Sequence, residues 1–324
     1  MKLKNLLLVL FCVASTYFVS AQSNLLNAKT PSEIGKKTAA QMESDNDKPL
    51  PYGYVHDRDV LMGKTIWELI DVDERINFPL YYPVDTAFVG KDRRSLFAVL
   101  LKGIKDGKIT EVYSDDYFNT KKSLKDMESV FKYIDTTDAG KDEVNNFRDQ
   151  YYPTPVTTKK KVNGKWVTET TTPPAKKLDA QFVNETELDA SDISGYKIKG
   201  YWYFDKRQSE LKYRLLAICP MATEARDKAK GNTDAIELFW VYFPSIRDVL
   251  HEAKAFNDKN SAMPITFDHL LNSRRFNGVI YKEENVYGDR QIDQYMKDNA
   301  QMQLLESERV KEKIRNFEQD MWNY

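Results

Sequence analysis

The chain has 324 residues, of which 41% are hydrophobic and 30% are charged. This composition allows a substantial core under a well-solvated surface and argues against a membrane-embedded protein. The 48 Lys and Arg residues nearly balance the 49 Asp and Glu residues, so no global attraction to nucleic acid or anionic lipid is expected.

The first 21 residues have the pattern of a cleavable export signal. Lys2 and Lys4 precede an apolar run over residues 6–19, and a small-residue cleavage site ends at Ala21. We expect cleavage after Ala21. A membrane anchor is the alternative, but the run is near the short end for a bilayer span.

The two cysteines argue against a lipid anchor and against an internal disulfide. Cys12 follows the bulky Phe11, which is a poor lipoprotein signal. Cys219 alone remains after cleavage, so no intramolecular disulfide can form, and its apolar neighbours predict a buried thiol. We therefore expect a soluble exported protein.

Residues 22–50 are polar and predict a flexible or extended N-terminal arm, followed by the folded part from residue 51. A helix is predicted over residues 57–70 from the spacing of Ile66, Trp67 and Ile70. After it, two prolines bracket an aromatic segment that ends at residue 83 and cannot continue the helix.

The next elements alternate between helices and a short strand. A helix is predicted over residues 93–106, with Gly107 as its C-terminal stop. A short strand is predicted over residues 109–114. Ser123 is expected to cap another helix, because Asp126 follows three residues later.

Residues 151–178 differ in composition and are rich in Pro, Thr and Lys. Asn163-Gly164 suits the type I′ turn of a β-hairpin, so we predict a protruding hairpin arm. A nucleic-acid patch in which Trp166 stacks on bases is the alternative, which the acidic remainder of the mature chain disfavours.

The following region is rich in predicted strands. Residues 196–204 and 210–218 alternate as an antiparallel pair, and residues 238–243 form an apolar run typical of a central strand. Ser245 is expected to cap a helix. The chain then predicts a helix over residues 265–276, a strand over 278–284 and a long charged helix over 289–323.

These elements predict an α+β fold: an antiparallel or mixed sheet packed by helices, with a long C-terminal helix. The expected organisation is a signal peptide (residues 1–21), an N-terminal arm (22–50), a core (51–290) that carries the hairpin insertion (151–178), and a C-terminal helix (291–324).

No motif for catalysis, cofactor binding or metal binding is visible. The three histidines lack metal-ligand spacing, and the chain has no HExxH, GxSxG or Walker A pattern. Asp71, Asp73 and Glu74 could form a paired-acid or divalent-ion site, but such spacing is common on solvated surfaces. We expect no catalytic residue, no cofactor and no metal. An exported hydrolase using Asp71, Asp73 or His251 is the alternative.

Aromatic residues are abundant, with 19 Tyr, 16 Phe and 5 Trp. Tyr, Trp and Arg dominate protein–protein hot spots, because they combine area with a polar group. For Tyr201 and Tyr203, packing under a second layer of helices is an equal alternative. The candidate partner contacts are Trp67, Tyr81, Tyr82, Trp166, Tyr201 and Tyr203.

Four segments resemble one known family, over about residues 60–296. They are IWELIDVDERINFPLYYP, GYKIKGYWYFD, LFWVYFPSIRDVL and RRFNGVIYKEENVYGDRQIDQYM. The chain resembles the GldN/PorN family of the type IX secretion system of Bacteroidota.

The resemblance implies a non-enzymatic subunit of the protein secretion and gliding motility machinery. It implies a periplasmic ring built by self-association with a GldK/PorK-like outer-membrane lipoprotein, in communication with a GldM/PorM-like, motor-linked inner-membrane protein. The lipoprotein would hold the chain at the periplasmic face of the outer membrane, and no nucleic acid is expected. An adaptor that binds secreted cargo is a further alternative.

Overall fold

The computed structural model describes residues 48–87, 89, 93–162, 165–171, 174–257, 265–297 and 299–322. The expected signal peptide and most of the expected N-terminal arm lie outside these residues. Within them, no helix combines the length and the apolar character that a membrane crossing requires. The described residues divide into two compact units: Lys122–Leu188 with Ala222–Ile236 form the second, and the other described residues form the first.

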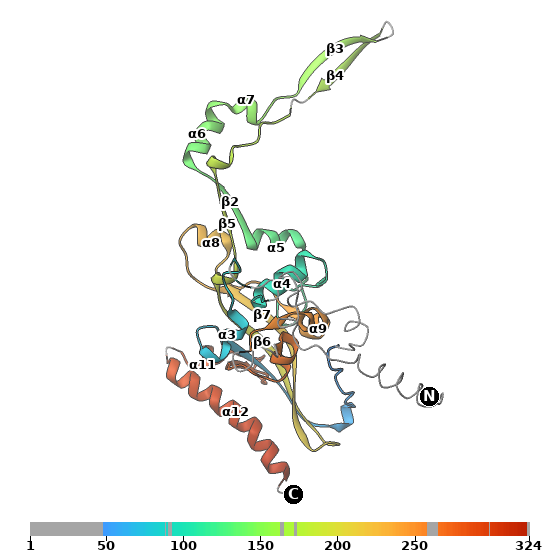
Figure 1. Cartoon of the computed structure of the whole chain (residues 1–324), viewed down its shortest axis with the longest axis vertical. Helices are drawn as coiled ribbons and strands as arrows, with labels where there is room; N and C mark the ends of the chain where they lie inside the picture. Colours follow the sequence, from blue (N-terminus) through green and yellow to red (C-terminus); the bar gives the residue numbers. More distant parts are fainter. Residues whose placement is uncertain are drawn as a thin grey trace, which may run out of the picture. The chain divides into compact units, whose positions relative to one another are not determined.

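The first unit is organised around a sheet with the strand order β12-β1-β6-β7-β8, in which β9 also pairs with β7. Figure 1 labels β6 and β7 of this sheet. β1 runs antiparallel to both β12 and β6, and β7 runs antiparallel to β9. With the flanking helices, this confirms the predicted α+β class. The strands are β1 (Val60–Asp71), β6 (Ile193–Asp205), β7 (Glu210–Ala222), β8 (Ile236–Glu237), β9 (Val241–Tyr242) and β12 (Val279–Glu283).

The helix predicted over residues 57–70 is wrong, because these residues form the short 3₁₀ helix η2 (Asp57–Asp59) and strand β1. β1 is central and covered on both faces, so Ile66, Trp67 and Glu68 are each only 1% exposed. Gly63 leaves room for a side chain of the neighbouring strand, because a Cβ at this position would lie 1.8 Å from the Tyr201 hydroxyl. Burial on both faces therefore explains the apolar run better than one helical stripe.

The aromatic segment after β1 folds into η3 (Arg75–Asn77) and the single-turn helix α3 (Phe78–Tyr81), with a proline in its first turn. Asn77 is fully buried and ties this segment to the start of β12. Its Nδ2 donates to the carbonyl oxygens of Asp71 at 2.7 Å and Asn277 at 3.0 Å, and its Oδ1 accepts from the Asn277 amide.

Helix α4 (Leu96–Lys105) confirms the prediction over residues 93–106. Ser95 caps it by accepting a hydrogen bond from the Ala98 amide, and Gly107 follows with a φ of 71°. Residues 109–114 are not a regular strand, which corrects that prediction. Tyr113 instead forms isolated bridges with Lys121 and Trp240.

Three expectations in residues 238–276 require correction. Leu238 to Val241 are buried as expected, but only β9 is regular strand. Helix α9 (Phe243–Glu252) begins before Ser245, whose hydroxyl donates to the Tyr242 carbonyl and does not cap the helix. Residues 265–276 contain β11 (Ile265–Thr266), paired with β10 (Lys254–Ala255), and then only the short helix α10 (Phe267–Asn272).

The strand predicted over residues 278–284 is confirmed by β12, but the helix over 289–323 is not continuous. It comprises α11 (Ile292–Tyr295) and α12 (Ala300–Trp322), because Met296 leaves the helical conformation with φ −115° and ψ 64°. α12 lies along the sheet in Figure 1. Its Val310 and Ile314 pack against Ile66 and Ile280.

The second unit contains the predicted capped helix and the predicted hairpin. In α5 (Leu124–Phe131), Ser123 and Asp126 form a reciprocal capping box. β3 (Val156–Val162) pairs antiparallel with β4 (Lys165–Thr171), while the Asn163-Gly164 turn lies outside the described residues. The other elements are β2 (Lys132–Thr136), α6 (Asp138–Asn146), α7 (Arg148–Tyr151), η4 (Ala180–Phe182), β5 (Val183–Glu187) and α8 (Ala225–Ala229).

Candidate interaction site

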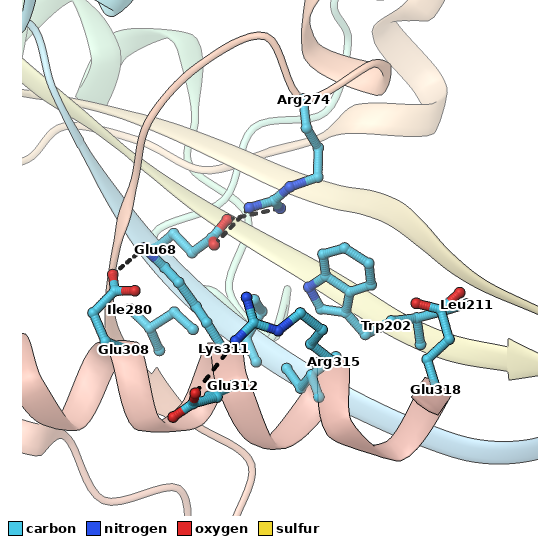
Figure 2. Close-up of a pocket in the computed structure, with 12 residues that line it drawn as sticks. Glu68, Trp202, Leu211, Arg274, Ile280, Glu308, Lys311, Glu312, Arg315 and Glu318 are labelled. Carbon is cyan, nitrogen blue, oxygen red and sulfur yellow. Dashed lines mark hydrogen bonds and ion pairs between the residues drawn. The ribbon is translucent and has the colours of Figure 1, made fainter. Parts of the chain in front are cut away.

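A groove separates one face of the sheet from helix α12. It has a volume of about 510 Å³, and Figure 2 shows the side chains that line it. We call it the α12 groove. Its apolar side chains come from β1, β6, β7, β12 and α12: Ile66, Trp202, Leu211, Ile280 and Ile314.

A buried ion pair lies in the sheet side of the groove. Arg274 donates to both carboxylate oxygens of Glu68, at 2.9 and 2.8 Å, while Glu68 is 1% exposed. The guanidinium also stacks over the rings of Tyr213 at 4.2 Å and Trp202 at 5.2 Å. Burial opposes the charge on Arg274, but the hydrogen bonds to Glu68 outweigh it and raise the pKa of Arg274.

The helix side of the groove carries alternating charges. Lys311 pairs with Glu308 at 2.9 Å, and Arg315 pairs with Glu312 at 3.3 Å. Glu318, near Trp202 and Leu211 in Figure 2, takes part in no ion pair within the described residues. Among the described lining charges, the others form ion pairs, so Glu318 is the one carboxylate without an ion-pair partner in this part of the chain.

The opposite face of β1 holds a cluster of cations and aromatic rings around Trp67. The ammonium groups of Lys282 and Lys199 lie 4.1 and 4.9 Å from the Trp67 ring centroid, and both also lie over Tyr117. Lys282 pairs with Asp116 at 2.9 Å, and Lys199 donates to the Asp116 carbonyl. Burial lowers the pKa of Lys199.

The predicted contact residues are distributed between core and surface. Trp67 is 1% exposed and Tyr203 6% exposed, so both rings pack inside the chain. Tyr201 is half-buried and stacks on Tyr203 with ring centroids 6.0 Å apart.

The other three predicted contacts lie elsewhere. Tyr82 is 48% exposed, and neighbouring Tyr81 donates its hydroxyl to the Ser191 carbonyl at 3.2 Å. Trp166 lies in β4, and its side chain is not among those that the structure describes. Partner contact by all six residues stays a prediction.

Two of the three acidic residues considered for catalysis accept hydrogen bonds within the chain. Asp71 Oδ1 accepts from the Asp73 amide at 2.9 Å, and Glu74 accepts from Asn277 Nδ2 at 2.7 Å. His251 lies near the C-terminal end of α9. In the described ranges, no three His, Cys, Asp or Glu side chains are grouped to hold a metal ion.

Sequence reasoning missed the ion pairs that join distant segments. Arg247 on α9 pairs with Asp268 on α10 at 2.7 and 3.0 Å, and Tyr52 stacks over Arg247 at 4.2 Å. Glu68 and Arg274 are 206 residues apart. One signal in the sequence could have indicated the Glu68 pair. Glu68 lies within an apolar run, and a charge that is buried in such a run needs a partner.

Comparison with known proteins identifies one family. A family model described as "Gliding motility associated protein GldN" matches residues 55–323. No curated protein matches the chain.

Proposed function

Because the chain belongs to the GldN family, which takes part in gliding motility and type IX secretion, we propose that it is a non-enzymatic structural subunit of the secretion machinery. The family match over residues 55–323 carries this proposal, since it spans nearly all of the described chain. The subunit acts in the periplasm, which its predicted export signal favours.

The proposed assembly is a ring in which the chain associates with itself and with a GldK/PorK-like outer-membrane lipoprotein. This lipoprotein holds the ring at the periplasmic face of the outer membrane, and a GldM/PorM-like inner-membrane protein links it to the motor. A closed ring requires heterologous contacts, in which one patch meets a different patch on the neighbour. Exposed aromatic side chains such as Tyr82 are suited to such contacts.

Buried charges in the described core support a structural role. Glu68–Arg274 and Arg247–Asp268 are bidentate ion pairs within the chain, so each carboxylate is occupied by its guanidinium. Such pairs fix distant segments in one arrangement, which suits a subunit that must present constant surfaces.

The β3–β4 hairpin is the element that we propose for assembly contacts in the second unit. The two strands pair only with each other in the sheets of the described residues. An isolated two-stranded hairpin is marginally stable in water by itself, so contact with a partner would stabilise it.

We expect that deleting residues 155–176 leaves a folded chain but weakens assembly with the lipoprotein. The mature wild-type and deleted chains are each co-expressed with the GldK-like lipoprotein, co-purified from membranes and imaged by negative stain. Circular dichroism and thermal melting of each chain alone provide the folding control.

The two claims fail in different ways. If the wild-type chain neither co-purifies with the lipoprotein nor forms rings, the proposed function is wrong. If rings form equally with the deleted chain, only the role of the hairpin is wrong.

A further inference from the structure

The loop between β12 and α11 presents two apolar side chains to solvent. Val286 is 93% exposed and Tyr287 is 76% exposed. Residues 284–290, which we call the Tyr287 loop, also carry Arg290, whose guanidinium lies 5.5 Å from the Tyr287 ring centroid. Tyr and Arg are the side chains most enriched in interaction hot spots.

Hydrogen bonds within the Tyr287 loop hold the loop in one conformation. Asn285 Oδ1 accepts from the amides of Tyr287 at 3.0 Å and Arg290 at 3.4 Å, and its Nδ2 donates to the carbonyls of Glu283 and Arg290. Gly288 and Asp289 take positive φ values of 77° and 57°. A preorganised loop loses less conformational entropy when it binds.

The loop is also anchored to the body of the first unit. Asp289 Oδ1 accepts from the Asn285 amide, and its Oδ2 accepts from the Tyr117 hydroxyl at 2.7 Å. The Tyr117 ring contacts Trp67, with 6.1 Å between centroids. Because Trp67 and Ile66 are adjacent on β1, they face opposite sides of the sheet, and Ile66 lines the α12 groove. The loop is thus anchored through the face opposite the groove.

The α12 groove is chemically complementary to the Tyr287 loop. Its volume of about 510 Å³ lies within the range of about 300–1,000 Å³ typical of binding clefts, so it can hold more than one side chain. Trp202 and Leu211 offer apolar surface, and Glu318 beside them is the carboxylate without an ion pair in the described chain. Arg290 likewise takes part in no ion pair within the described residues.

We propose that the Tyr287 loop of one copy inserts into the α12 groove of a second copy, with Val286 and Tyr287 on the apolar surface and Arg290 paired with Glu318. Loop and groove are different patches of the same chain, so the contact is heterologous and can repeat around a ring. The inference deepens the proposed self-association and rests on it.

Charge reversal tests this contact in the full-length mature chain. Arg290→Glu and Glu318→Arg are prepared separately, and self-association is measured by sedimentation over a range of concentrations. Each variant alone should self-associate about tenfold or more weakly than wild type, as expected for loss of a hot-spot contact.

An equimolar mixture of the two variants should regain association, because each loop then meets a groove of opposite charge in the other variant. This rescue requires contact between different copies. Lys206→Glu and Asp320→Arg are the matched controls: both residues are exposed, and neither lines the groove nor belongs to the loop.

The aromatic part of the contact has its own test. Tyr287→Ala should weaken association about tenfold or more, whereas Tyr54→Ala, at a residue 83% exposed, should leave it unchanged. The same variants are assembled with the GldK-like lipoprotein.

The contact is refuted if the charge variants self-associate like wild type, if their mixture shows no rescue, or if wild type stays monomeric both alone and with the lipoprotein. If lipoprotein rings form equally with every variant, the contact is wrong while the proposed function stands. If no variant, including wild type, associates with the lipoprotein, the proposed function itself fails.

Discussion

At the scale of single residues, Glu68 shows how a charge is accommodated inside this sheet. Glu68 is 1% exposed, and within the described residues its carboxylate forms an ion pair only with Arg274. We predict that Arg274→Met destabilises the chain by about 3–5 kcal/mol, because it leaves a buried charge without a partner. The measurement is the free energy of unfolding in urea.

Arg275 provides the matched control, since it is exposed and adjacent in sequence. Arg275→Met should change the unfolding free energy by less than about 0.5 kcal/mol. Adding Glu68→Gln to Arg274→Met should recover part of the loss, because the uncompensated charge is removed. Equal destabilisation by the two arginine substitutions would contradict the assigned role of the ion pair.

At the scale of elements, several local signals predicted the element that formed, although Ser245 does not cap α9 as expected. Ser123 begins a helix where a capping side chain was expected, and residues 196–204 and 210–218 alternate as expected of strands. β1 was mistaken for a helix, because a strand buried on both faces has an apolar run without the alternating period. The α12 groove could not be predicted, since Glu68 and Arg274 meet only through the fold.

The capping box of α5 gives a prediction for a single element. Ser123→Ala should lower the stability of the second unit by about 1 kcal/mol, because the Asp126 amide loses its acceptor. Ser129→Ala on the same helix is the control: its hydroxyl bonds only the Asp126 carbonyl within the described chain, so the substitution should be nearly neutral. Helical circular dichroism during urea unfolding compares them, and equal effects would exclude a capping role.

At the scale of the whole molecule, the two units differ in how their sheets are buried. The β1–β6 ladder in the first unit contains the fully buried Ile70, Tyr196 and Ile198. The β2–β5 ladder in the second unit has no buried residue along either strand, and its Ile134 is 57% exposed. The two ladders therefore differ in the burial of their side chains more than in their backbone pairing.

This difference predicts unequal protection in native-state hydrogen exchange. Amides of β1 and β6 should exchange only with global unfolding of the first unit, whereas those of β2 and β5 should exchange on the order of a hundredfold faster through local opening. Peptide-resolved mass spectrometry of the intact chain measures both ladders in one sample, so solution conditions are matched internally. Equal protection would mean that the two units unfold as one cooperative body, because local openings would then be too rare to separate the ladders.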